Sequence, residues 1–335
     1  DGKTLFTTDE TGDAPVTSYD ISDLQDIKEL DQFRPQATIG TGVIPHNVHP
    51  WQDWLIVSYY TDGCILVDGS RPENLIEVGN FDTYVPTNTG FAGAWGVYPY
   101  LPSGLVLVSD INNGMYVLQP TYVRACYLEG KITDAANGAG IAGATIDILG
   151  DLAEEKSKLG GGYATGLATA GSYEVTVSKA GYLPFTTTVT LENGVVTELN
   201  VALQSLPTFS FSGKVKDAAS GEGVPGAKIQ VLNDDFTFNI EADAQGNFAI
   251  PAFYAGNYDL LAGKWGYKTA QLTSQDFSET NNSTEITLEK GIEDVFSLDL
   301  GWTVEGDAVQ GHFELGDPIG IEPQACIFVQ PENDV

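Results

Sequence analysis

The sequence predicts an all-β protein built from several small modules, and three observations support this fold class. Apolar and polar residues alternate with a period of two in short runs such as 144–148 and 173–177, which is the pattern of half-buried strands. The 335 residues include 38 Gly and 16 Pro, which indicates many tight turns. A segment of about 80 residues also occurs twice in tandem, so two modules share one fold.

Residues 1–122 form the first predicted module, a part of a β-propeller. Apolar strands that end in Asp and a turn occur at 16–23, 64–72 and 105–111, at intervals of roughly 40–50 residues. Such a period is typical of propeller blades, and about three blades fit into this length. Propellers need about four to eight blades, and an open one exposes unpaired sheet edges. We therefore expect further chain or other subunits to complete the module.

The two repeated modules are predicted at 123–205 and 206–291. Residues 128–149 and 211–232 align at an offset of 83 residues, and the similarity continues at an offset of 85 residues. Each copy alternates apolar and polar residues between turns rich in Gly and Asn. This pattern predicts a small antiparallel β-sandwich for each copy.

The last module, residues 292–335, is predicted to be the start of a further jelly-roll-like β module. The runs 296–302 and 311–318 have the pattern of opening strands. The segment is too short for a whole domain of this kind, so we expect further chain or another subunit to complete it.

The charge balance excludes two classes of partner. Lys and Arg number 15 against 46 Asp and Glu, which gives a formal net charge of −31. Nucleic acids and anionic membranes both attract basic patches, so we expect neither as a partner. No apolar run reaches the roughly 18 residues of a membrane-spanning helix, so we expect no membrane insertion. The acidic, Lys-poor composition favours a secreted or surface-exposed protein.

The repeated modules resemble the carboxypeptidase regulatory-like, or transthyretin-like, domain. The shared motif reads G-K-[IV]-x-D-A-x-x-G-x-G-[IV]-x-G-A and is followed by G-x-Y and K-x-G-Y. The resemblance implies two β-sandwiches that serve mainly as spacers and stabilisers.

The first module resembles the LVIVD-type repeats of the choice-of-anchor B family of bacterial surface proteins. The residues that carry the match are Phe6–Glu10, His46–His49, Ser58–Tyr60, Phe81–Thr83, Ala94–Gly104 and Val108–Leu118. The resemblance implies a β-propeller and a location on the outside of a bacterial cell.

Acids and histidines of the first module form a candidate metal site. Asp9, Glu10 and Asp62 can supply oxygen ligands to a divalent metal on one propeller face, and His46 and His49 can supply imidazoles. Because residues i and i+3 of an extended chain point to opposite faces, the two histidines share a metal only if the chain turns between them. The alternative is that these side chains satisfy backbone groups between blades. The many loop carboxylates favour calcium over zinc, and no other cofactor is expected.

Aromatic residues are frequent in the same module. Trp51, Trp54, Tyr60, Trp95 and Tyr98 can stack sugars or anchor a protein, which predicts a surface for a glycan or protein partner. The alternative is ordinary packing between the blades.

The chain carries no recognisable catalytic motif. The patterns G-x-S-x-G and H-E-x-x-H are absent, and three histidines allow few catalytic arrangements. We therefore predict no catalytic residues and a non-enzymatic extracellular structural or adhesion protein of a bacterial cell surface. Two alternatives stay open: a subunit of a filament or sheath assembled by strand exchange, and a secreted metal-dependent enzyme with its site on the propeller face.

The three cysteines, Cys64, Cys126 and Cys326, lie far apart and form no metal-binding pair of the CxxC type. We interpret them as reduced and mostly buried thiols. The alternative is one long-range disulfide and a leftover thiol.

Overall fold

The all-β fold class is confirmed by the computed structural model, which describes residues 2–86, 90–149, 154–291, 297–301, 312–316 and 326–330. Within these ranges the regular structure consists of β-strands and one 3-10 turn, η1 (Gln36–Thr38). No helix in this described part is long and apolar enough to cross a membrane. The chain divides into two compact units, Asp1–Ser205 and Leu206–Val335, which are treated separately below.

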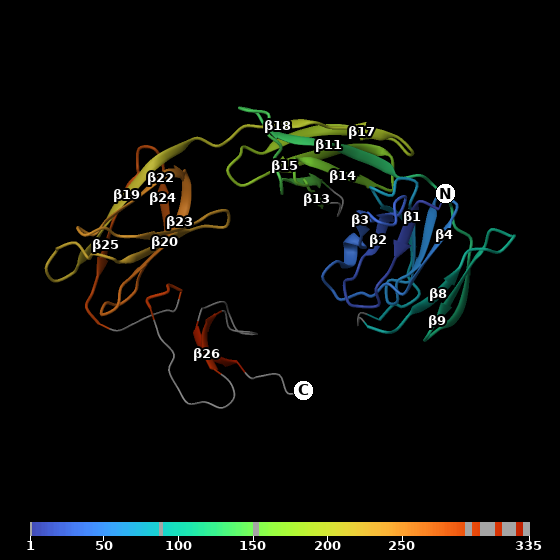
Figure 1. Cartoon of the computed structure of the whole chain (residues 1–335), viewed down its shortest axis with the longest axis horizontal. Coiled ribbons are helices and arrows are strands. Elements are labelled where there is room, and N and C mark those ends of the chain that lie inside the picture. The colour runs from blue at the N-terminus through green and yellow to red at the C-terminus, as the bar shows by residue number, and fades with distance from the viewer. Residues whose placement is uncertain are drawn as a thin grey trace. The chain divides into compact units, whose positions relative to one another are not determined.

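The first unit begins with three consecutive antiparallel sheets, each a simple meander (Figure 1). The first sheet contains β1 (Thr4–Thr7), β2 (Val16–Asp20) and β3 (Lys28–Phe33). The second contains β4 (Asn47–Trp51), β5 (Trp54–Ser58), β6 (Cys64–Asp68) and β7 (Ile76–Phe81). The third contains β8 (Ala94–Tyr98), β9 (Val106–Asp110) and β10 (Gly114–Leu118). No pairing among the described strands joins the first sheet to the third, and a propeller stays a prediction.

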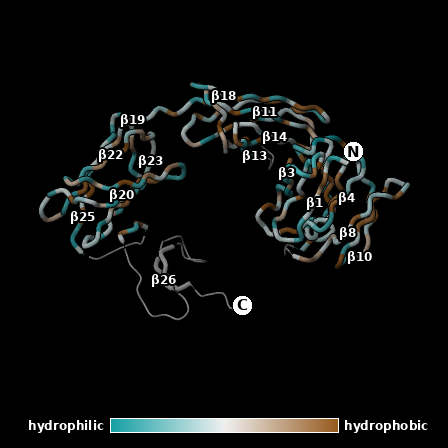
Figure 2. Tube along the Cα trace, in the orientation of Figure 1, coloured by the Kyte–Doolittle hydropathy of each residue, from teal (hydrophilic) through white to brown (hydrophobic). Residues whose placement is uncertain are grey.

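The second sheet is the centre of two hydrophobic cores. Leu55 and Val57 of β5 pack in a core with the first sheet. Trp54 and Ile56, which alternate with them, pack in a core with the third sheet. All residues of β5 and β6 are therefore buried, and this two-sided burial holds the three sheets together. Figure 2 shows the hydrophobic stretches of this region close to β4 and β10.

The strands that end in Asp occupy different places in their sheets. β6 is the third strand of its meander, whereas β9 is the second. Asp110 at the end of β9 accepts the N–H groups of Asn112 and Asn113 at 2.8 and 2.6 Å. An Asp after an apolar strand thus marks a turn of any kind, because its carboxylate caps the next N–H groups. It does not mark a fixed position in a blade.

Two β-sandwiches of the same strand order follow. The first consists of a sheet with β14 (Gly162–Leu167), β11 (Cys126–Asp134), β17 (Val196–Glu198) and β18 (Val201–Leu203), and a sheet with β13 (Glu154–Lys156), β12 (Thr145–Ile148), β15 (Gly171–Ser178) and β16 (Phe185–Leu191). The second consists of a sheet with β22 (Asn247–Tyr254), β19 (Thr208–Asp217) and β25 (Ser283–Leu288), and a sheet with β21 (Thr237–Glu241), β20 (Lys228–Leu232), β23 (Gly256–Gly263) and β24 (Ala270–Phe277). The predicted duplication is confirmed.

Each sandwich mixes parallel and antiparallel pairs, which corrects the predicted antiparallel arrangement. β11 runs parallel to β17 and β18, and β19 runs parallel to β25. The first and last strands of each module can run in the same direction because the chain crosses the other sheet between them. The alternation of apolar and polar residues is the same for either strand direction, so the sequence pattern contains no information about it.

The two sandwich cores differ in their side chains. In the second sandwich, Phe211 stacks on Phe253 with ring centroids 4.6 Å apart and lies at the same distance from Phe277. The core of the first sandwich is mainly aliphatic, with Leu128 and Ile132 fully buried. The duplication has therefore kept the strand order while the core side chains have changed.

One polar contact of the repeated motif occurs in both copies. The hydroxyl of Tyr182 donates to Asp134 Oδ2 at 3.0 Å, and the hydroxyl of Tyr267 donates to Asp217 Oδ2 at 3.0 Å. Backbone N–H groups of the following turn donate to the same carboxylates. The N–H of Ser220 is the largest cause that lowers the pKa of Asp217 to about 2, and a backbone N–H likewise lowers the pKa of Asp134. The Asp and Tyr of the motif thus fix the turn after the first strand.

The predicted C-terminal module lies mostly outside the described residues. β26 (His312–Gly316) and β27 (Cys326–Gln330) pair as an antiparallel hairpin. Their presence agrees with a β module. Of the strand expected at 296–302, residues 297–301 are described and form no strand, and the jelly-roll topology falls outside the described part of the chain.

The Gly-x-Gly pair of the repeated motif meets two different constraints. Gly138 has a φ of 72°, a left-handed conformation that favours glycine in a turn. Gly140 instead lacks space, because a Cβ there would lie 2.0 Å from the carbonyl oxygen of Gly160. Both glycines are therefore required by the fold.

The substitution Gly140→Ala is expected to lower the free energy of unfolding by about 1–3 kcal/mol, because the backbone must move to admit the methyl group. The matched control is Gly162→Ala in β14, where a Cβ meets nothing within 4 Å. We expect this control to change stability by less than about 0.5 kcal/mol. Chemical denaturation of both variants measures the difference, and equal stabilities would contradict the close packing at Gly140.

Candidate functional site

The structure brings together two of the five predicted metal ligands. Nε2 of His46 lies 3.6 Å from Oε1 of Glu10. The hydroxyl of Tyr60 also donates to Glu10 Oε1, and the ring of Trp95 stacks on His46 with centroids 5.2 Å apart. Nδ1 of His46 is buried and has no hydrogen-bond partner in the described part of the chain, so only Nε2 faces a carboxylate.

The remaining three predicted ligands have other neighbours. The hydroxyl of Thr38 donates to Asp62, and the backbone carbonyl of Asp9 accepts an N–H within a turn. His49 packs edge-on against Tyr100 at 6.0 Å, and burial followed by the charge of His46 lowers the pKa of His49. Among the residues that the structure describes, no three His, Cys, Asp or Glu side chains gather to hold a metal ion. The metal site stays a prediction.

The five predicted aromatic ligand-binding residues fall into two groups. Trp95 and Tyr98 of β8 are 53% and 48% exposed. Trp54 and Tyr60 are buried, and Trp51 packs against the core between the second and third sheets. The buried group follows the alternative interpretation, in which the aromatic side chains pack between sheets.

Two further exposed rings join Trp95 and Tyr98. Phe91 is 65% exposed and Tyr100 is 44% exposed. Tyr98 and Tyr100 meet edge to face at 5.4 Å, whereas Phe91 contacts the buried Tyr60 at the same distance. We call Phe91, Trp95, Tyr98 and Tyr100 the aromatic strip. Such rings can stack on sugars or anchor a protein side chain, and Trp95 and Tyr98 are the members of the strip that the sequence predicted.

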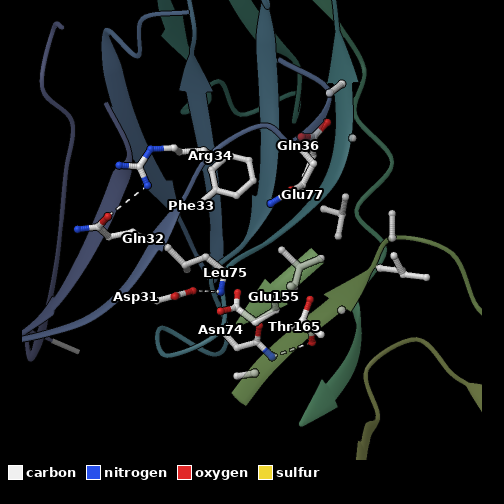
Figure 3. A pocket seen from close by; sticks show the side chains of 18 residues that line it. Asp31, Gln32, Phe33, Arg34, Gln36, Asn74, Leu75, Glu77, Glu155 and Thr165 are labelled. Atoms are coloured by element: carbon white, nitrogen blue, oxygen red, sulfur yellow. Dashed lines mark hydrogen bonds between the residues drawn. The ribbon is translucent and has the colours of Figure 1, made fainter. Parts of the chain in front are cut away.

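A cleft of about 360 Å³, which the sequence analysis missed, lies in the first unit (Figure 3). Four strands line it, β3, β7, β13 and β14, and each is an edge strand of a different sheet. The lining segments are 31–34, 36–37, 74–79, 155 and 164–168. Because these segments lie far apart in the sequence and share no motif, no local pattern indicates the cleft.

Two carboxylates of the cleft have raised pKa values. Burial raises the pKa of Asp31, although the N–H of Leu75 donates to its Oδ2 at 2.7 Å and partly opposes the shift. Burial also raises the pKa of Glu155, and the charge of Asp31 adds to this effect. The two side chains come from different strands and lie in the same part of the cleft in Figure 3. Neither forms an ion pair in the described part of the chain.

The guanidinium of Arg34 lies in the cleft but is already engaged. Its Nε donates to the carbonyl oxygen of Asp13 at 2.7 Å, and Nη1 donates to Gln32 Oε1 at 3.2 Å. On the opposite side, Nδ2 of Asn74 donates to the carbonyl oxygen of Thr165 at 3.0 Å. The cleft therefore combines open strand edges with negative charge, a combination suited to an extended, cationic ligand.

Beside the cleft, Arg71 joins the second sheet to the first sandwich. Its Nε and Nη2 donate to the two carboxylate oxygens of Glu129 at 2.9 and 2.8 Å. The hydroxyls of Ser70 and Tyr127 are 3.0 Å apart, and the guanidinium lies 5.5 Å from the ring centroid of Tyr127. A bidentate pair of this kind fixes orientation as well as distance.

A second arginine, Arg124, joins the same two parts. Its Nη1 donates to Asp68 Oδ1 at 2.8 Å, and Nη2 donates to Asp53 Oδ2 at 2.7 Å. The guanidinium stacks over the ring of Trp54 at 4.3 Å. The N–H of Ala125 donates to Asp68 Oδ2 at 2.9 Å. Two of the three arginines in the chain thus lie at this contact, which we call the junction.

Two of the three cysteines are buried free thiols, as expected. Burial raises the pKa of Cys64 to about 12, and it also raises the pKa of Cys126. The side chain of Cys326 lies outside the described residues. A protonated, buried thiol is chemically inert, so neither described cysteine is a candidate nucleophile.

Comparison with known families supports the two sandwiches. Residues 127–204 and 210–291 each match the family model of the carboxypeptidase regulatory-like domain. The tandem β-sandwich domains predicted from the repeated motif are thereby confirmed. A search of curated proteins finds no significant match.

Several solved structures resemble parts of the chain. The streptococcal ancillary pilin is 13% identical over 83% of this chain and 81% of its own, with a TM-score of 0.36. The shaft pilin SpaA from Lactobacillus rhamnosus GG is 16% identical over 52% of this chain and 100% of its own, with a TM-score of 0.29. The match to the Bacillus anthracis TIE protein has 15% identity and a TM-score of 0.26, and it covers 56% of this chain and 41% of that protein. Similarities at this level carry no argument about function.

The variant Glu155→Gln is expected to melt at a higher temperature than the native protein at pH 7. Because the pKa of Glu155 is raised in the folded state, its ionised form opposes folding. This penalty is absent well below the ordinary pKa of about 4.3, appears as the pH rises through the raised pKa, and persists above it. The melting temperatures should therefore converge at pH 3, as thermal unfolding followed by circular dichroism can show.

The control for this prediction is Glu174→Gln, which removes an exposed carboxylate of β15 outside the cleft. We expect no stabilisation from it at either pH. A lower melting temperature of the Glu155→Gln variant at pH 7 would show that the carboxylate stabilises the fold, contrary to the prediction.

Proposed function

We propose that the chain is a non-enzymatic structural or adhesion protein of a bacterial cell surface, in which the β-sandwiches act as rigid spacers. The observation that carries this proposal is the junction, which locks the N-terminal sheets onto the first sandwich. Its arginines make bidentate and stacked contacts and neutralise Asp68, whose side chain is fully buried. A connection that only needed to be flexible would not require such contacts.

The composition supports an extracellular role. With 46 acidic and 15 basic residues, the chain repels other acidic surfaces and stays soluble at high concentration. The bacterial cell surface is inferred from the resemblance of the first module to LVIVD-type repeats, and the spacer role from the resemblance of the sandwiches to regulatory-like domains. The expected partners are further chain or other subunits next to the N-terminal sheets, and a glycan or protein on the aromatic strip.

Assembly by strand exchange is a second candidate, and the strand count of the sheets favours it. The first and third sheets have three described strands each, whereas the second has four. β1 and β10 each pair on one side only among the described strands, so a neighbouring subunit could donate a strand to the other side. In this version the chain is a subunit of a filament or sheath.

A metal-dependent enzyme is less well supported. Of its predicted ligands, Glu10 and His46 lie together, whereas His49 and Asp62 contact other side chains. A catalytic metal usually needs three protein ligands and an open position. The geometry therefore favours the structural role.

The substitution Arg124→Ala is expected to lower the free energy of unfolding of the first unit by about 2 kcal/mol. Breaking a buried ion pair usually costs about 3–5 kcal/mol, and the smaller figure allows for a guanidinium that is about one third exposed. We also expect chymotrypsin to cleave the segment between β10 and β11, after Tyr122, faster in this variant, because the sheets are no longer held on the sandwich. Denaturant unfolding and limited proteolysis of the full chain measure both effects.

The control is Lys28→Ala, which removes an ion pair with Asp26 in which both side chains are 64% exposed. Such a pair contributes at most about 1 kcal/mol, and its loss should not change cleavage near β11. If Arg124→Ala behaves like this control in both measurements, the junction is not a rigid connection and the spacer proposal fails.

A further inference from the structure

The edge of β14 that faces the cleft pairs with no described strand, and it contains the half-buried Ala164 and the buried Gly166. The N–H of Tyr127 in β11 donates to Val195, so the peptide groups of Tyr127 point away from β14. Tyr127 is paired with Gly166, and in an antiparallel pair both residues then direct their groups outward. Gly166 and, two residues earlier, Ala164 therefore direct N–H and C=O groups to the open edge. Both residues line the cleft.

The side chains of the cleft define the charge of a matching ligand. Asp31 and Glu155 are both carboxylates without an ion pair in the described part of the chain. After burial, the charge of Asp31 also raises the pKa of Glu155, whereas the charge of Lys158 lowers the pKa of both carboxylates. Arg34 is occupied by Asp13 and Gln32 and cannot turn to them without losing two hydrogen bonds. A cation from a ligand would pair with these carboxylates. The attraction would be strengthened because both carboxylates are partly shielded from water.

We propose that this cleft binds an extended peptide segment with a Lys or Arg side chain, which adds as a strand to the edge of β14. The backbone groups of Ala164 and Gly166 would bind the main chain, and Asp31 and Glu155 would bind the cationic side chain. A volume of about 360 Å³ is within the usual range of ligand sites. The partner is a basic protein segment and not a second copy of this chain, because acids outnumber bases by 46 to 15 here.

The test uses a seven-residue peptide of alternating Thr and Val with a central Lys, acetylated and amidated at its ends. Two control peptides carry a central Gln or Glu in place of Lys and therefore differ in charge. A third control peptide carries N-methyl groups on the amides of one edge of the extended strand, which removes the N–H donors that would pair with β14. Calorimetric titration into the full chain should give binding for the Lys peptide, at least about tenfold weaker binding for the Gln peptide, and none for the Glu and N-methylated peptides. Amide exchange at Ala164 and Gly166 should slow when the Lys peptide is bound.

Variants of the protein locate the binding. The double variant Asp31→Asn and Glu155→Gln keeps side-chain oxygens of the same size, so Leu75 retains its acceptor. This double variant should bind the Lys peptide at least about tenfold more weakly than the native protein does, and its affinity for the Gln peptide should be unchanged. Ala164→Pro removes an outward N–H at an edge position that tolerates proline and should abolish binding. Glu174→Gln, an exposed carboxylate of the same sandwich, should have no effect.

Three results overturn the proposal. Equal affinities for the Lys and Glu peptides would remove the role of the two carboxylates. Unchanged amide exchange at Ala164 and Gly166 would exclude strand addition at β14. Equal binding to the native protein and to the double variant would mean that the peptide adsorbs to the acidic surface in general. If Ala164→Pro fails to fold, the N-methylated peptide tests the same backbone contact on the native protein.

Discussion

The buried carboxylate of Asp68 is the interaction on which the first unit depends. Its side chain is fully buried, and a charge in that position is costly unless several donors reach it. Burial alone would raise the pKa of Asp68, but the N–H of Ala125 and the donors of Ser70 outweigh it and lower the pKa. Arg124 supplies the opposite charge. Since Asp68 ends a strand of the central sheet and Ala125 leads into the first sandwich, one carboxylate holds both parts.

The sandwiches were the part of the fold that the sequence predicts best, because their constraints recur at fixed spacing. Asp134 and Tyr182 of one copy reappear as Asp217 and Tyr267, and each pair makes the same hydrogen bond. The Asp side chain caps a turn, and the Tyr hydroxyl donates to that Asp. Because the contact needs both residues, both copies of the repeat contain the pair. The parallel pairing of β11 with β17 leaves no such trace, since it depends on where the chain crosses between sheets and not on any residue type.

The candidate sites were harder to predict because exposure is set by neighbouring sheets. Trp54 and Trp95 are the same residue type in the same module, yet one is buried in the central sheet and the other is exposed on β8. The cleft is a stronger case, because Asp31 of β3 and Glu155 of β13 form one site only where the edges of different sheets meet. Composition could show that carboxylates are abundant, but not which two line a cleft without an ion pair in the described part of the chain.

The scarcity of cations gives these observations a common cause. The three arginines serve internal contacts: Arg71 pairs with Glu129, Arg124 with Asp68 and Asp53, and Arg34 binds a backbone carbonyl. Arginine suits these places because its planar fork binds two oxygens and stacks on rings, which the compact ammonium of lysine does less well. With the arginines so engaged, Asp31 and Glu155 of the neighbouring cleft have no guanidinium partner in the described part of the chain. Because the guanidinium groups serve internal contacts, the cleft beside the junction keeps two carboxylates that an external cation could pair with.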